Sequence, residues 1–305
     1  MSRPAALAGL ALATAVALSA CGGATASQGG SGASRVGADG RIGVVASTDV
    51  YGSIVAAVGG AKVDVHSIIT DPAADPHSYE ATAQDKLAVS KAALGVANGA
   101  GYDDFFTNLA AGVLPAKDIV TVAATPGLDA AAPNFNEHLW YSLPTMATLA
   151  DTLATRLSAI APADAGTFTK NAAAFKATLG GLQSRLAVLK KKNDGGAGVA
   201  ITEPVPLYLL QEAGYSNKTP EAYSKAIEDG SDVPPLVLKE TTDLVKSSAV
   251  RFLAYNAQTE GPQTAEVKKA AESAGKPVLD FTETLPAGQD YLQWMDANVS
   301  SLERL

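Results

Sequence analysis

The chain has 305 residues, a formal net charge of −8 and a single cysteine. Its acidic balance and the lack of any basic stripe argue against a nucleic-acid partner. One cysteine excludes an intramolecular disulfide and a metal site built on several thiolates.

The first twenty residues are typical of a targeting segment rather than of a folded domain. Arg3 gives a positive start, and residues 4–18 form an apolar run that is too short to span a bilayer comfortably. The run leads into Leu-Ser-Ala-Cys, which is similar to the lipobox of bacterial lipoproteins. We therefore expect residues 1–20 to be a lipoprotein signal peptide and Cys21 to carry a lipid anchor. An ordinary signal peptide with a chance cysteine is the alternative.

Residues 21–40 are rich in glycine, serine and alanine and contain almost no bulky apolar side chain. Such a segment cannot bury enough surface to fold, so it predicts a flexible tether. The remaining chain is expected to divide into an N-terminal lobe over 41–162, a linking helix over 163–192 and a C-terminal lobe over 193–305.

Short apolar runs alternate with helical patterns along the body, which favours parallel sheets with crossover helices. The expected strands cover residues 42–46, 63–69, 92–97, 119–123, 199–202, 250–255 and 277–281. The expected helices between them cover residues 50–58, 83–91, 235–246, 265–274 and 291–302. These patterns predict an α/β fold with two parallel-sheet lobes.

Two consecutive helices interrupt the alternation in the middle of the chain, over 144–160 and 163–192. The second has apolar side chains at alternating four- and three-residue steps, which predicts one continuous buried stripe. The stripe consists of Phe168, Ala172, Phe175, Leu179, Leu182, Leu186 and Leu189. Gly180 and Gly181 in its middle predict close packing or a bend. We expect one long rigid helix between the lobes.

Four metal-capable side chains lie where expected strands end or where the central helices begin. They are His77, His138, Glu203 and Glu283. Open parallel sheets place ligands beyond the carboxyl ends of their strands, so two facing lobes would bring these groups to the cleft between them. Two imidazoles and two carboxylates suit a first-row divalent metal, because the carboxylates neutralise a dication. Spacing alone does not establish that the four meet.

Two segments have the appearance of family motifs. Residues 75–80 (Asp-Pro-His-Ser-Tyr-Glu) are similar to D-P-H-x-Y-E, and residues 136–140 (Asn-Glu-His-Leu-Trp) are similar to N-P-H-x-W. Looser similarity extends over 199–208 and 281–285. On these segments the chain resembles the manganese- and zinc-binding receptor lipoproteins of bacterial ABC importers, a family of solute-binding proteins.

The resemblance implies an extracytoplasmic, monomeric receptor anchored to the membrane through Cys21. Its cargo would be Mn²⁺ or Zn²⁺, which it would deliver to the permease of an ABC importer. The metal ligands implied are His77, His138, Glu203 and Glu283, in the cleft between the lobes. Glutamate at position 203 is typical of manganese-binding members, but zinc has the higher intrinsic affinity, so the physiological metal stays open.

The chain departs from the family pattern at Glu137, where proline is usual, and at Glu283, where aspartate is usual. Asp280 is therefore an alternative fourth ligand, although its expected place inside a strand favours Glu283. Glu80 and Tyr79 are expected to orient His77 rather than to bind metal.

Two other functions are alternatives to transport. A metal-dependent hydrolase could use three ligands and a water, with Glu80 or Glu137 as the base, but neither H-E-x-x-H nor G-x-S-x-G occurs. A surface adhesin is a further alternative, for which these residues supply no mechanism. We therefore expect a protein that is not an enzyme. His66, in the middle of an expected strand, is interpreted as structural or solvent-facing.

Overall fold

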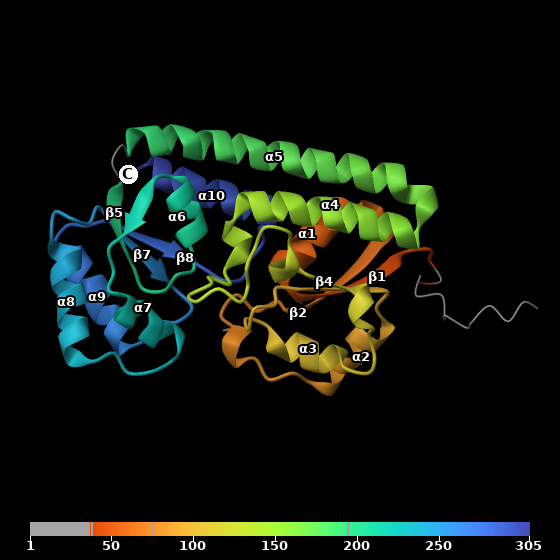
Figure 1. Ribbon diagram of the computed structural model, residues 1–305, viewed down its shortest axis with the longest axis horizontal. Helices are drawn as coiled ribbons and strands as arrows, with labels where there is room; N and C mark the ends of the chain where they lie inside the picture. The colour runs from red at the N-terminus through yellow and green to blue at the C-terminus, as the bar shows by residue number, and fades with distance from the viewer. Residues whose placement is uncertain (1–36, 38, 75, 194–195) are drawn as a thin grey trace, which may run out of the picture. The chain divides into compact units, whose positions relative to one another are not determined.

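Two four-stranded parallel sheets form the framework of the protein (Figure 1). The computed structural model describes residues 37, 39–74, 76–193 and 196–305. The predicted signal peptide over 1–20, the predicted anchor Cys21 and most of the predicted tether over 21–40 lie outside the described residues. The described residues belong to one compact unit.

The first sheet has the strand order β2-β1-β3-β4. Its strands are β1 (Ile42–Thr48), β2 (Val63–Ile69), β3 (Leu94–Ala97) and β4 (Ile119–Thr121). Side chains of β1 alternate between the two faces: Val44 and Ala46 join one buried cluster and Val45 joins the other. The helices α1 (Asp49–Gly59) and α4 (Leu143–Ile160) cover the first face, and α2 (Ala83–Lys91) and α3 (Asp104–Ala110) cover the second.

The second sheet repeats this arrangement with the strand order β6-β5-β7-β8. Its strands are β5 (Ala197–Ile201), β6 (Tyr215–Asn217), β7 (Leu253–Asn256) and β8 (Val278–Phe281). One face packs on α7 (Glu221–Glu228), α8 (Pro235–Lys246) and α9 (Pro262–Ser273). The other face packs on α6 (Leu207–Glu212), α5 (Ala165–Lys192) and α10 (Tyr291–Glu303). Helices on both faces are what an all-parallel sheet requires.

The long helix α5 runs along both lobes (Figure 1). Its buried residues are the seven predicted from the apolar stripe, Phe168 to Leu189. It packs on α1 and α4 of the first lobe and on α6 and α10 of the second. Arg185 adds ion pairs to Asp296 and to Glu303 of α10. One apolar core therefore continues from lobe to lobe beneath α5.

The two glycines in the middle of α5 do not mark a close contact. A Cβ atom built on Gly180 or on Gly181 would meet nothing within 4 Å. The expectation of close packing at these positions is therefore wrong, because the glycines lie on the outer side of the helix rather than on its buried stripe.

The predicted α/β fold, with two parallel-sheet lobes and one long helix, is confirmed. Four short elements, β6, α3, α6 and α7, lie outside every predicted range, and each has only three to eight residues. Short 3₁₀ turns complete the described elements: η1 (Gly60–Lys62), η2 (Pro76–Ser78), η3 (Ala116–Asp118), η4 (Val122–Ala124), η5 (Leu139–Tyr141) and η6 (Pro162–Asp164). Within the described part of the chain, no helix combines the length and the apolar character needed to cross a membrane.

Candidate metal centre

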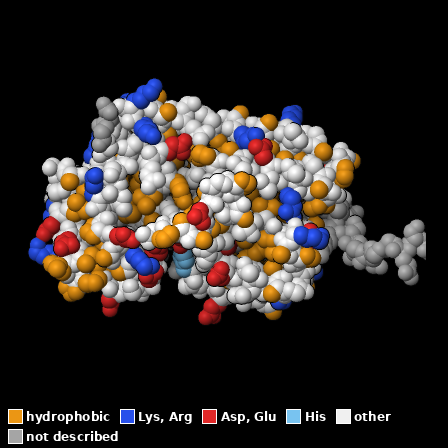
Figure 2. All heavy atoms as spheres, in the orientation of Figure 1, with side chains coloured by type: hydrophobic (Ala, Val, Ile, Leu, Met, Phe, Trp, Pro, Cys, Tyr) orange, Lys and Arg blue, Asp and Glu red, His pale blue; other side chains and the backbone are white. Residues whose placement is uncertain are grey.

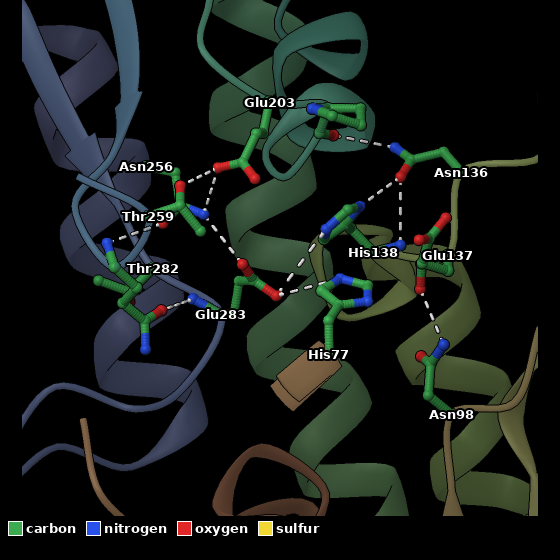
Figure 3. A network of polar contacts seen from close by, with 12 residues as sticks. His77, Asn98, Asn136, Glu137, His138, Glu203, Asn256, Thr259, Thr282 and Glu283 are labelled. Carbon is green, nitrogen blue, oxygen red and sulfur yellow. Dashed lines mark hydrogen bonds and ion pairs between the residues drawn. The ribbon is translucent and has the colours of Figure 1, made fainter. Parts of the chain in front are cut away.

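Three of the four predicted ligands converge where strands of both lobes end (Figure 3). His77 lies on η2, which follows β2, and His138 lies directly before η5; Glu283 follows β8. Their ligand atoms all lie within 4.8 Å of one another. The Nε2 atoms of His77 and His138 are 3.9 and 4.0 Å from Oε2 of Glu283. This spacing between two imidazoles and a carboxylate suits a small cation drawn in between them.

The environment of His138 prepares one ring nitrogen to bind a metal. Its Nδ1 lies 2.7 Å from Oδ1 of Asn136, whose Nδ2 donates to the carbonyl of Pro204 at 3.0 Å. Because the amide nitrogen already donates, the amide oxygen must accept, so Nδ1 of His138 carries the proton. Nε2 then presents its lone pair toward Glu283, and the hydrogen bond to Nδ1 orients the ring.

Burial favours the neutral form of the His138 ring by lowering its pKa. The residue is 1 % exposed. Burial, with a smaller contribution from the nearby His77 ring, lowers the pKa of His138 from 6.5 to about 3. A neutral imidazole is the form that coordinates metals.

The loop around His138 is held from both lobes. Asn98, which follows β3, donates from Nδ2 to the carbonyl of Glu137 at 2.9 Å and accepts from the hydroxyl of Tyr51. Tyr208 of α6 donates to the carbonyl of Asn136 at 2.8 Å. The ring of Trp140 packs edge-on against His138 with its centroid 5.2 Å away. These contacts fix the loop and bury the ring.

Glu203 lies beside this group and is joined to it through one amide (Figure 3). Nδ2 of Asn256 donates to Oε2 of Glu203 at 2.7 Å and to Oε1 of Glu283 at 2.9 Å. The hydroxyl of Thr259 also donates to Oε2 of Glu203. Both carboxylates are buried, at 4 and 1 % exposure. Glu203 is not in the group of three ligands found among the described residues, so its coordination of metal stays a prediction.

Glu283 is buried on a loop that the first lobe holds, whereas Asp280 is exposed on β8 opposite Tyr255. The hydroxyl of Tyr141 donates to the carbonyl of Thr282 at 2.9 Å. This difference in position supports Glu283 over Asp280 as the ligand.

The remaining predicted residues lie outside the group of three. Glu80 is exposed, and His66 is exposed on β2. The hydroxyl of Tyr79 donates to Oδ2 of Asp85 at 3.0 Å, at the start of α2. Glu80 and Tyr79 were expected to orient His77. The ring of Tyr102 packs edge-on against the His77 ring, with a distance of 5.1 Å between the ring centroids.

A cavity of about 660 Å³ opens beside His77. Figure 2 shows a histidine in this hollow with acidic side chains on either side. Glu137 and Glu228 line it and offer ligand atoms within 4.8 Å of one of His138. Burial, followed by the charges of Glu137 and Glu203, raises the pKa of Glu228 from 4.5 to about 8. His138 belongs to both groups, and the first group contains a second imidazole, which favours it over this one as a site for a first-row transition metal.

Three polar residues at and just after the end of β7 belong to the site although the sequence alone did not single them out. They are Asn256, Gln258 and Thr259. Asn256 ends β7, so the same strand-end rule that selected Glu203 and Glu283 could have selected it.

Comparisons with known proteins show the family and the fold of the chain. The family described as zinc-uptake complex component A, periplasmic (ZnuA), matches residues 44–305. The iron ABC transporter substrate-binding lipoprotein MtsA of Streptococcus pyogenes serotype M1 is 28 % identical over 229 residues, which cover 69 % of this chain and 71 % of MtsA. The metal ABC transporter substrate-binding lipoprotein FimA of Streptococcus parasanguinis is 24 % identical over 287 residues, covering 88 and 90 % of the two chains.

A solved structure shares the fold. FpvC of Pseudomonas aeruginosa, determined in complex with Mn²⁺, superposes with a TM-score of 0.71 over 87 % of this chain and 97 % of FpvC, at 24 % identity.

Proposed function

This chain belongs to the zinc-uptake complex component A family, and we propose that it is a receptor that captures Mn²⁺ or Zn²⁺ outside the cytoplasm and delivers the ion to the permease of an ABC importer. The family consists of substrate-binding proteins rather than enzymes, so the ion is cargo and not a catalytic cofactor. The observation that carries the proposal is the convergence of His77, His138 and Glu283 from loops of both lobes.

The chemistry of the site fits capture of a dication. Two imidazole nitrogens and the carboxylate of Glu283 supply three ligands, and Glu203 is the proposed fourth. Two buried carboxylates side by side repel each other, and the Asn256 amide between them offsets only part of that repulsion. A dication neutralises both charges, which favours binding over a monovalent cation.

The ligand set leaves two metals in competition. Carboxylate oxygen is a hard ligand that suits Mn²⁺, whereas Zn²⁺ lies higher in the general order of affinities for mixed nitrogen and oxygen sites. The relatives' names include iron as well as unspecified metal. Iron therefore belongs in any comparison of metals on the purified protein.

We propose that a lipid on Cys21 holds the receptor at the membrane as a monomer. The curated relatives are named lipoproteins, which supports the anchor. Residues 1–20 would be removed, 21–40 would form the tether, and the lobes over 41–162 and 193–305 would be joined by the helix over 163–192. Because one core continues beneath α5, we expect the lobes to move little when the ion is released.

Elemental analysis of the purified protein tests the proposal. We expect about one equivalent of metal in the wild type and clear loss of bound metal in His77→Ala, Glu203→Ala and Glu283→Ala. His66→Ala is the matched control, since this histidine is exposed on β2 away from the site. Wild-type metal content in His77→Ala and Glu283→Ala alike would contradict the proposal.

A further inference from the structure

Gln258 contacts both of the loops that carry the metal-binding side chains of the two lobes. Its Nε2 donates to the carbonyl of Pro72 at 2.8 Å and to the carbonyl of Ala74 at 3.2 Å, in the loop that leads to His77. Its Oε1 accepts from the backbone N–H of Glu283. One side chain of the second lobe therefore joins the His77 loop to the Glu283 loop.

The groups around Gln258 hold its amide in one orientation. Nε2 also donates to the hydroxyl oxygen of Thr284 at 2.7 Å, and the backbone N–H of Gln258 donates to Oδ1 of Asn256 at 3.1 Å. An amide group has two N–H donors, and the shortest contacts, to Pro72 and Thr284, use both of them, so the longer contact to Ala74 shares one of these hydrogens. A reversed amide would place its oxygen against the carbonyl oxygens of Pro72 and Ala74. The structure therefore specifies that Nε2 faces the His77 loop and Oε1 faces the backbone of Glu283.

The first part of the loop before His77 depends on such a contact, because residues 70–73 are exposed. Closer to His77 the loop packs on the first lobe, where Ala74 contacts an apolar cluster and Pro76 is buried. Asp71 makes local bonds, accepting from the backbone N–H groups of Ala73 at 2.9 Å and of Ala74 at 3.0 Å. Local turns of this kind shape a loop but do not fix it to the rest of the protein. Loops with few buried apolar contacts open at low free-energy cost.

We propose that Gln258 is a positioning residue that clasps the His77 loop to the Glu283 loop and so sets how tightly the metal is held. The proposal rests on the proposed function. Gln258 acts through His77 and Glu283, whose Nε2 and Oε2 atoms are 3.9 Å apart, and does not itself bind the ion. Its contacts to Pro72 and Ala74 cross between the lobes, so they must break before His77 can leave the metal with its loop.

Titration of the full chain with Mn²⁺ tests the clasp. Gln258→Met keeps the length of the side chain but removes its hydrogen bonds, and we expect it to weaken Mn²⁺ binding roughly 10- to 100-fold, mostly through faster dissociation. Gln263→Met is the matched control. Gln263 makes the same two-sided clasp on Val233, donating to its carbonyl at 3.1 Å and accepting from its N–H at 3.0 Å, within the second lobe. The affinity of Gln263→Met for Mn²⁺ should stay within about twofold of that of the wild type.

A spectroscopic measurement separates positioning from general loss of structure. The chain has only three histidines. In the metal-free protein we expect Gln258→Met to shift or broaden the NMR ring signals of His77 while those of His66, outside the site on β2, keep their wild-type positions. Unchanged His77 signals, or equal disturbance of His66 and His77, would overturn the proposal.

The outcome also distinguishes this inference from the proposed function. If wild type binds Mn²⁺, His77→Ala does not, and Gln258→Met binds like wild type, then only the clasp is wrong. If His77→Ala binds Mn²⁺ like wild type, then the proposed metal site is wrong. The proposed role of Gln258 is then wrong as well, because it depends on that site.

Discussion

Replacing His138 with glutamine should make the metal-free protein more resistant to acid. The folded-state pKa of His138 is about 3, whereas the ordinary value is 6.5. Between these two pH values the unfolded chain binds a proton that the folded chain does not bind, so a falling pH favours unfolding. The contribution of the neutral ring to stability is intact above pH 6.5 and is lost progressively as the pH falls toward 3.

The size of this effect follows from the same two pKa values. At pH 4 the pH lies about 2.5 units below the ordinary pKa, and each unit is worth ~1.4 kcal/mol. His138 should therefore remove about 3 kcal/mol of unfolding free energy between pH 7 and pH 4, an order-of-magnitude figure. In His138→Gln this component of the acid sensitivity is absent.

Urea unfolding of the metal-free protein at pH 7 and at pH 4 measures the difference. Each variant is compared with itself at the two pH values, so any constant cost of the substitution cancels. His66→Gln is the control, because His66 is exposed on β2 and should leave the wild-type acid sensitivity in place. Equal losses in wild type and in His138→Gln would refute the reasoning, since the ring would then accept a proton in the folded protein as easily as in water.

Two further predictions concern the site and the long helix. Asn256→Ala removes donors to two buried carboxylates, and hydrogen bonds to charged groups are worth about 1.5–3 kcal/mol each, so the metal-free protein should lose about 3 kcal/mol or more in urea unfolding. Asn171→Ala, which loses one bond to the carbonyl of Val58, should cost about 1 kcal/mol, and an equal loss in both variants would contradict the prediction. Gly180→Ala and Gly181→Ala should each raise the free energy of unfolding by about 0.5–1 kcal/mol, because a Cβ there meets no atom within 4 Å; a decrease would show a contact or bend that requires glycine.

The fold was predictable where apolar periodicity is long. The stripe from Phe168 to Leu189 predicted the buried side of α5 residue by residue, because a 28-residue helix repeats its pattern many times. The three-residue strand β6, Tyr215–Asn217, has no such repeat, and its place at the edge of the sheet comes from pairing with β5. The packing around Gly180 could not be predicted either, because the apolar pattern of a helix does not show whether another element covers the polar side of that helix.

The candidate site was predictable where a single residue follows a strand. His77 and Glu283 were selected because each follows a strand, His138 was selected by its motif and its place before the central helices, and the structure brings the three together. The contact between Gln258 and Pro72 joins residues 186 positions apart, which no local pattern encodes. Glu203 shows the same limit, because only the fold reveals that Asn256 stands between it and Glu283.

Anomalous diffraction from crystals grown with Mn²⁺, and separately with Zn²⁺, tests the central claim most directly. The account predicts one principal peak bound by Nε2 of His77, Nε2 of His138 and the carboxylate of Glu283, with ligand distances close to 2 Å for zinc. A principal peak between Glu137 and Glu228, or no peak near His77, would contradict it.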